Sequence, residues 1–206
     1  MQDKYMAYVG SYSYTGKAKG ITVFDVDVEN GMFKERCEIE VDNSSYVIAS
    51  SDGKTLYSIA DEGVVSFRIL PNGSLARLNS SSIRGMRGCH LCTDEEDKYV
   101  FVSGYHDGKT TVLNLNPDGS VGKIVDGVFD RGYGSVAERN FRPHVTCTRR
   151  MPDNRFVLSV DNGIDQVKIY RFNDKEQKLV QVDAIRCDLE SAPRHFRYSK
   201  DGKFIY

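Results

Sequence analysis

The sequence predicts an all-β fold, and three observations support this prediction. Short apolar segments alternate with polar residues at a period of two, which is typical of half-buried strands. Turn sequences separate these segments, and the chain has 18 Gly but only 5 Pro, which suits many tight hairpins. No stretch combines a helical apolar stripe with helix caps. We therefore expect strands joined by short turns throughout.

The predicted strands follow one another along the whole chain. They cover residues 5–10, 21–28, 54–59, 63–69, 99–102, 110–115, 155–160 and 166–170. The turn sequences are Asn30-Gly31, Pro71-Asn72-Gly73 and Pro117-Asp118-Gly119. Each of these turns comes shortly after a predicted strand, so we expect each to start a hairpin.

The strands form a repeat about as long as one propeller blade. Aspartates mark four equivalent polar turns, Asp52, Asp97, Asp153 and Asp201, with steps of 45, 56 and 48 residues. A β-only repeat of roughly 40–50 residues indicates propeller blades, because a single four-stranded sheet must stack on neighbours to bury both faces. We therefore predict a β-propeller of four-stranded antiparallel blades, with about four blades in the 206 residues.

Composition excludes several classes of protein. With 28 basic and 29 acidic residues the net charge is −1, so we expect neither nucleic acid nor a membrane surface as partner. No apolar stretch is long enough for a membrane helix, and the N-terminus lacks a secretory signal. The five cysteines are an odd number, which favours free thiols and a cytoplasmic location. Cys89 and Cys92 have metal-like spacing but no second pair, so we expect a structural role for them.

Several motifs stand in an order that matches one protein family. They are Tyr8-Val9-Gly10-Ser11-Tyr12, Gly20-Ile21-Thr22-Val23-Phe24, Gly88-Cys89-His90, Arg142-Pro143-His144, Asp161-Asn162-Gly163-Ile164-Asp165 and Ala192-Pro193-Arg194-His195. Together they resemble the bacterial lactonase family, which includes propeller-type 6-phosphogluconolactonases and fungal 3-carboxy-cis,cis-muconate lactonizing enzymes. The resemblance implies a seven-bladed propeller. Because Lys203–Tyr206 stops inside an apolar strand, we expect residues 1–206 to be the N-terminal part of an incomplete propeller domain.

The resemblance also implies an active site at one mouth of the central channel. It puts the family's catalytic histidine at His144 and a catalytic arginine at Arg194, and it puts an acidic partner beyond Tyr206. His90 begins its repeat as His144 does, so we expect it to face the same channel. The remaining candidates for substrate binding are Arg139, Arg142 and His195. We expect no metal and no organic cofactor.

These residue types suit the opening of a lactone. His144 would act as the base that activates water. Arg194 would stabilise the oxyanion or bind a carboxylate of the substrate. The alternative for either residue is structural, since a histidine at a strand start can satisfy backbone groups and a lone arginine is usually a surface charge. We expect Asp161 and Asp165 to act in a turn rather than in catalysis.

Three functions remain open. The first is hydrolysis of a sugar lactone, with 6-phosphogluconolactone as the leading substrate. The second is a cycloisomerase that forms a lactone from a 3-carboxymuconate-type acid, and the third is a propeller that binds a ligand or partner without catalysis. The polar segment 122–140 should form a loop near the mouth and help to separate the first two. Without the acidic partner, and with unpaired sheet edges, we expect the 206 residues alone to be inactive.

Overall fold

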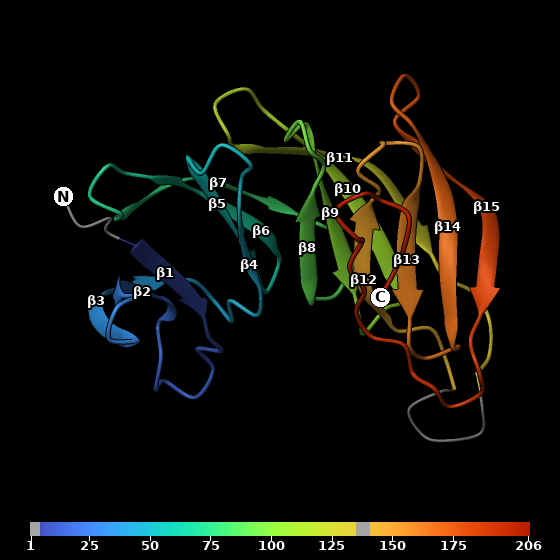
Figure 1. The fold of residues 1–206 in the computed structure, drawn as a ribbon, viewed down its shortest axis with the longest axis horizontal. Helices are drawn as coiled ribbons and strands as arrows, with labels where there is room; N and C mark the ends of the chain where they lie inside the picture. The colour runs from blue at the N-terminus through green and yellow to red at the C-terminus, as the bar shows by residue number, and fades with distance from the viewer. Residues whose placement is uncertain (1–4, 135–140) are drawn as a thin grey trace.

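The computed structural model describes residues 5–134 and 141–206. Strands and turns make up this part of the chain, with four antiparallel sheets following one another in sequence (Figure 1). The first sheet contains β1 (Tyr5–Gly10), β2 (Gly20–Asp27) and β3 (Met32–Glu40). The second contains β4 (Val47–Ala49), β5 (Thr55–Ala60), β6 (Gly63–Ile69) and β7 (Leu75–Ser82).

The two later sheets have the same up-and-down order. The third contains β8 (His90–Thr93), β9 (Tyr99–Gly104), β10 (Lys109–Leu115) and β11 (Val121–Phe129). The fourth contains β12 (Val145–Arg150), β13 (Val157–Asp161), β14 (Gln166–Asn173) and β15 (Lys178–Arg186). This confirms the predicted all-β, blade-like architecture, although the first sheet has three described strands instead of four. No helix in the described ranges has the length and apolarity to cross a membrane.

The predicted loop over 122–140 is wrong in its first half. Gly122–Phe129 belongs to β11, which is the outermost strand of its sheet. The strand forms because its apolar residues pack on both sides: Ile124 joins the core shared with the second sheet, and Val125 joins the core shared with the fourth. Residues 135–140 lie outside the described residues.

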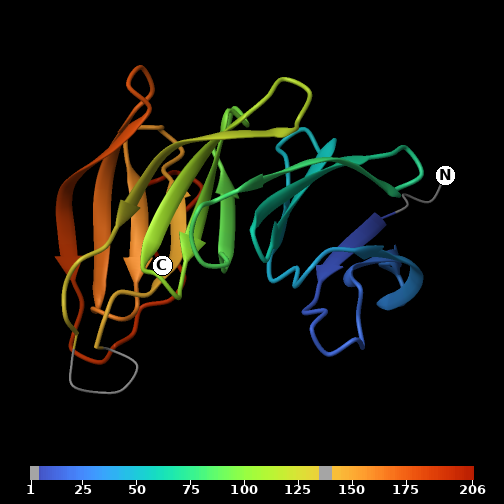
Figure 2. The ribbon, with the colours of Figure 1, turned by 180° about the vertical axis from the view of Figure 1, so that it is seen from behind.

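Apolar cores between neighbouring sheets hold the blades face to face. Figures 1 and 2 show the sheets in an arc, from the first blade (blue) at one end to the fourth (orange) at the other. The second and third sheets share a core with Ile59 and Leu91, and the third and fourth share one with Phe101 and Phe172. Because both faces of the third sheet are covered, every residue of β9 is buried.

The first strands of four blades end in the same turn, which gives a common reference point. In four blades the backbone N–H of one residue donates to the carbonyl five residues later, and the residue three positions on has a positive φ. The donors are Ser50, Asp94, Met151 and Ser199. The last of these turns lies shortly after Arg194. Residues 194–206 therefore begin a further blade, in which the backbone of Arg197 pairs with the backbone of Tyr206.

Side chains also connect each first strand to the next blade. The hydroxyl of Ser45 donates to the carbonyl of Gly88 at 3.2 Å, and the thiol of Cys89 donates to the carbonyl of Val145 at 3.4 Å. Ser45 and Cys89 are each five residues before the reference turn. This position therefore links neighbouring blades around the axis, and it explains why Cys89 is a structural thiol.

Arg150 joins the third and fourth blades through a buried charge. Its side chain is 4% exposed and lies 3.6 Å from the carboxylate of Asp94, whose side chain is 2% exposed. Arg150 also pairs with Asp174 at 2.8 Å and lies over the ring of Phe172. Because an unpaired buried carboxylate is costly, removing this guanidinium should weaken the contact between the third and fourth blades.

Replacing Arg150 by alanine should lower the free energy of unfolding by about 3–5 kcal/mol, because Asp94 is left buried without its cation. Urea denaturation at neutral pH measures the loss. Arg155→Ala is the matched control, since Arg155 pairs with Asp153 on the surface of the same blade and exposed pairs contribute little. Equal effects of the two substitutions would contradict this assignment.

Candidate active site at the channel mouth

His144 lies directly before β12 and its side chain has a defined tautomer. The residue is 4% exposed, and its ring stacks on Tyr105 with centroids 4.3 Å apart. Its Nδ1 lies 2.6 Å from the carbonyl oxygen of Tyr105. Since a carbonyl only accepts, Nδ1 carries the proton, and the lone pair of the neutral ring is at Nε2. The imidazole is therefore oriented as a Brønsted base.

Asp161 fixes the backbone that carries His144. One carboxylate oxygen, Oδ1, accepts from the N–H of His144 at 2.8 Å and from the N–H of Gly163 at 2.9 Å. Gly163 leaves no room for a side chain, because a Cβ there would lie 1.9 Å from the carbonyl oxygen of Arg142 and 2.8 Å from the His144 ring. The predicted turn role of Asp161 thus places the histidine.

Asp165 binds the backbone of the segment that leads into the next blade, as Asp161 binds the backbone of His144. Its carboxylate accepts from the backbone N–H groups of Glu190 and Ala192, both at 2.8 Å. Ala192 lies two residues before Arg194. The loop 161–165 therefore positions the starts of two consecutive first strands, the one with His144 and the one with Arg194.

A second buried carboxylate, Asp130, stands behind Asp161. Asp130 accepts from the hydroxyl of Tyr170 at 2.8 Å and lies 3.5 Å from the ammonium of the buried Lys168. Burial raises the pKa of Asp161 to about 7, and a hydrogen bond with Asp130 adds to the rise. The Oδ2 atoms of Asp130 and Asp161 have no other hydrogen-bond partner. When Asp161 carries a proton it can donate to Asp130, which satisfies both oxygens.

Arg194 lies at the same end of the blades as His144. Its carbonyl accepts from the hydroxyl of Thr146 at 2.8 Å, and its side chain is exposed. Burial raises the pKa of the nearby Cys89 thiol to about 12, and the positive charge of Arg194 partly opposes this rise. Cys89 in turn contacts the backbone N–H of Tyr105, on which His144 stacks. Arg142 is also exposed, over the ring of Phe141. Arg139, the remaining arginine predicted for substrate binding, lies outside the described residues.

His90 and His195 lie at a different level from His144. Each stands four residues before its reference turn, where the fourth blade has Cys147. A register shift between Val145 and Cys147 lengthens β12, so His144 begins its strand three residues earlier than this level. The shared strand-start pattern of His90 and His144 therefore does not correspond to a shared position. Because Val145 and Cys147 pair with the adjacent residues Asp161 and Val160, His144 lies two ladder steps from the level of Cys147, or about 7 Å at about 3.3 Å per step.

His90 is completely buried and neutral. Its Nε2 lies 3.2 Å from an N–H of Arg149, so Nε2 accepts and Nδ1 carries the proton. Burial lowers its pKa to about 3, and the positive charges of Arg149, His195 and Arg197 lower it further. His90 therefore holds Arg149 in place and does not reach solvent itself.

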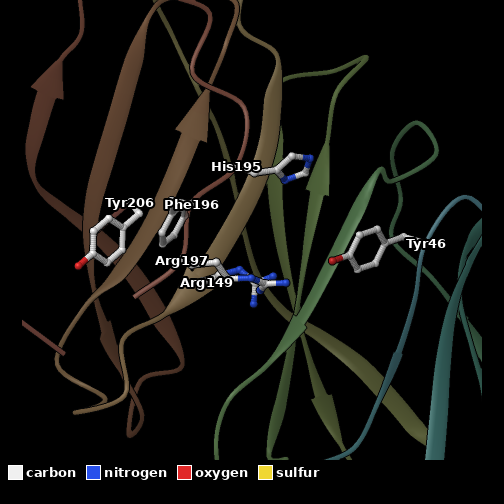
Figure 3. A pocket seen from close by; sticks show the side chains of 6 residues that line it. All are labelled: Tyr46, Arg149, His195, Phe196, Arg197 and Tyr206. Carbon is white, nitrogen blue, oxygen red and sulfur yellow. The ribbon is translucent and has the colours of Figure 1, made fainter. Parts of the chain in front are cut away.

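Sequence reasoning missed three residues at this inner level. Tyr46, Arg149 and Arg197 line one pocket together with the predicted residue His195 (Figure 3). The signal that could have found them is the reference turn: Arg149 and Arg197 both stand two residues before it, and Tyr46 stands four residues before it, level with His90 and His195. Among the described residues no group of three or more His, Cys, Asp or Glu side chains is arranged to hold a metal ion.

Comparisons with known proteins agree with this geometry. A family model described as a lactonase, seven-bladed beta-propeller, matches residues 6–206. The chain is 31% identical over 209 residues to the 6-phosphogluconolactonase of Bacillus subtilis, covering 98% of this chain and 59% of that protein. It is 27% identical to the 6-phosphogluconolactonase of Formosa agariphila, covering 97% and 60%.

Solved structures show the same arrangement of blades. A crystal structure from Bacteroides fragilis aligns with a TM-score of 0.90 at 31% identity, covering 100% of this chain and 61% of that one. The periplasmic gluconolactonase of Pseudomonas aeruginosa aligns with a TM-score of 0.90 at 25% identity, covering 99% and 61%. The chain thus spans about three fifths of the length of these relatives.

The shared proton of Asp161 predicts a pH dependence of stability. Between about pH 4 and pH 7 the folded chain keeps a proton that the unfolded chain has lost, so Asp161 makes the free energy of unfolding fall as pH rises through this window. Asp161→Asn keeps both hydrogen-bonding roles but does not titrate, so it should remove this contribution. Urea denaturation at a series of pH values measures it.

The comparison must be between the wild type and this variant, because the buried His90 contributes the opposite slope in both proteins. Asp153→Asn, at an exposed carboxyl of the same blade, is the control and should leave the descending contribution in place. Identical pH profiles for the wild type and Asp161→Asn would show that Asp161 is ionised in the folded chain.

Gly163→Ala should destabilise the chain by about 1–3 kcal/mol, because the new methyl group displaces the Arg142 carbonyl and the His144 ring. Thermal unfolding measures the loss, and the proton resonances of the His144 ring should shift. In Gly127→Ala the added Cβ would lie 3.1 Å from Cε of Lys109 and 3.7 Å from the carbonyl oxygen of Thr110, much looser contacts, so this variant serves as the control. Unchanged His144 resonances in Gly163→Ala would contradict the close contact.

Proposed function

The chain belongs to the lactonase family of seven-bladed β-propellers, and we propose that the protein it forms hydrolyses a sugar lactone, with 6-phosphogluconolactone as substrate. The observation that carries this proposal is the hydrogen bond from His144 Nδ1 to the carbonyl of Tyr105, which leaves Nε2 as a base. Relatives named 6-phosphogluconolactonase support the choice of substrate.

In the proposed reaction Nε2 of His144 takes a proton from a water molecule as that water attacks the lactone carbonyl carbon. Arg194 stabilises the negative charge that develops on the carbonyl oxygen. The carbonyl then re-forms, the bond to the ring oxygen breaks, and the imidazolium returns its proton to that oxygen. The products are the open-chain acid and a neutral His144, ready for another cycle.

Asp161 acts as a positioning residue in this scheme. It holds the His144 backbone and keeps its second oxygen turned toward Asp130. Because the pKa of Asp161 is raised to about 7, the site behind His144 carries less negative charge near neutral pH than two ionised carboxylates would. Arg142 is exposed at the same end and is the proposed contact for an anionic group of the substrate.

A lactone-forming cycloisomerase is the second candidate. The observation that favours it is the excess of positive charge: no described carboxylate lies within ion-pair distance of Arg142 or Arg194. A 3-carboxymuconate-type acid carries more anionic groups than a lactone and would use these arginines for its carboxylates. One loop holds the backbone of His144 and the backbone just before Arg194, at the same end of consecutive blades, which supports catalysis over ligand binding alone.

We also propose a cytoplasmic location. All five cysteines are free, and a reducing compartment keeps thiols in this state. A structural relative from Pseudomonas aeruginosa is named as periplasmic, so localisation of a tagged protein in fractionated cells is the direct test.

Hydrolysis of 6-phosphogluconolactone by the whole protein tests the proposed function. His144→Gln should lower kcat by about 10²–10⁴-fold, because the base is lost while the shape of the side chain is nearly kept. Arg194→Gln should also lower kcat. Arg171→Gln, an exposed arginine on β14, is the matched control and should keep full activity.

The outcomes separate the three functions. Loss of hydrolysis in the two site variants, with activity kept in the control, supports the lactonase. Absent hydrolysis together with cyclisation of a 3-carboxymuconate-type acid would replace it by the cycloisomerase. Absence of both reactions in the wild type would overturn a catalytic role.

A further inference from the structure

A cationic pocket lies on the channel side of the first strands, deeper than His144. It has a volume of about 410 Å³, and its lining includes Tyr46, Arg149, His195 and Arg197. Figure 3 shows the guanidinium groups of Arg149 and Arg197 turned into this space, with the hydroxyl of Tyr46 facing them from the other side. These side chains come from three different blades.

The two arginines have no anionic partner among the described residues. None of the ion pairs of the described chain includes Arg149 or Arg197. Arg149 donates only to neutral acceptors, His90 Nε2 at 3.2 Å and Cys92 Sγ at 3.8 Å. Its Nε is buried and has no hydrogen-bond partner.

The environment of His195 confirms that the positive charge is concentrated here. Burial lowers the pKa of His195, and Arg194, Arg149 and Arg197 lower it further. Arg149 and Arg197 have the same effect on His90. The protein as a whole has a net charge of −1, so this local excess of cations is a property of the channel and not of the overall composition.

The surroundings hold Arg149 in a fixed orientation. His90 is completely buried and packs against the tilted ring of Tyr46, with ring centroids 4.7 Å apart. Through its Nε2 it fixes the position of one guanidinium nitrogen. A preorganised guanidinium with unused N–H donors is suited to bidentate contact with an oxyanion.

We propose that this pocket binds a phosphate-class oxyanion between Arg149 and Arg197, with His195 and the Tyr46 hydroxyl as further donors. Two guanidinium charges, of which Arg149 is held in place by His90, match a dianion better than a single carboxylate. The inference does not depend on lactone hydrolysis, because Arg149 and Arg197 stand at a different level from His144. The anion can be free phosphate or the phosphate group of a substrate, and the experiment separates these sources.

Titration calorimetry of the whole protein with inorganic phosphate tests the proposal. The wild type should bind phosphate with one site, and Arg197→Gln should weaken binding at least tenfold. Arg149→Gln should do the same, while Arg149→Lys should restore part of the affinity because it keeps the charge but loses the fork geometry. Arg171→Gln is the control and should bind as the wild type does. Arg197 is exposed, so its variant should fold normally.

A second readout follows His195 directly. Phosphate should raise the pKa of His195 in a proton-NMR titration, because a bound dianion offsets the neighbouring arginines. The rise should be absent in Arg197→Gln. Competition between phosphate and 6-phosphogluconolactone would identify the pocket as the place of the substrate's phosphate, and binding without competition would identify a separate phosphate site. Both results support the proposal.

Two results would overturn it. One is no phosphate binding to the wild type at millimolar concentration. The other is binding that Arg149→Gln and Arg197→Gln leave unchanged. Either can occur while lactone hydrolysis persists, and phosphate can bind where no hydrolysis is found, so this inference and the proposed function fail separately.

Discussion

The arrangement of this end of the molecule depends on the hydrogen bonds that the loop 161–165 makes to the strands beside it. Asp161 accepts from the backbone of His144, and Asp165 accepts from the backbone just before Arg194. The two carboxylates thus satisfy N–H groups where first strands begin and sheet pairing has not started. Since one short hairpin holds both strand starts, the relative position of His144 and Arg194 is set by a few backbone contacts. Gly163 is required between them because the Arg142 carbonyl occupies the space of a side chain.

Buried charge is balanced in different ways near His144 and near Arg149 and Arg197. Behind His144, the raised pKa of Asp161 limits the negative charge of two neighbouring carboxyl groups, while Lys168 and Tyr170 contact Asp130. At the inner level, the histidines stay neutral and the arginines keep their charge, because arginine does not lose its proton under such conditions. Protonation of Asp161 can lower the negative charge of the first cluster without any external ligand. The second cluster can be neutralised only by an anion from outside the described residues.

The sequence predicts the middle strands of the blades well and the edge strands poorly. β6 and β9 are apolar along their length because both faces are covered, so their pattern is clear. β15 lies at an edge, and most of its residues are exposed, so its mixture of charged and apolar residues gives a weak signal. β11 shows the same difficulty: its glycines and charges suggest a loop, while burial of Ile124 and Val125 makes it a strand.

The candidate site shows a second limit of prediction from the sequence, which concerns the alignment of strands from different blades. His90 and His144 both stand at the start of a repeat, and local sequence gives no reason to separate them. The separation comes from the register shift between Val145 and Cys147, which is a property of pairing with β13. Counting from the turn at the far end of each strand recovers the true correspondence, because that turn has the same hydrogen bonds in four blades. The family motifs therefore point to His144 and Arg194 as candidates, which stay predictions, whereas Arg149 and Arg197 emerge from their equal distance to that turn. The proposed base, His144, lies at a different level from Arg149 and Arg197, and this arrangement is suited to a ligand whose reactive group and anionic group lie at opposite ends.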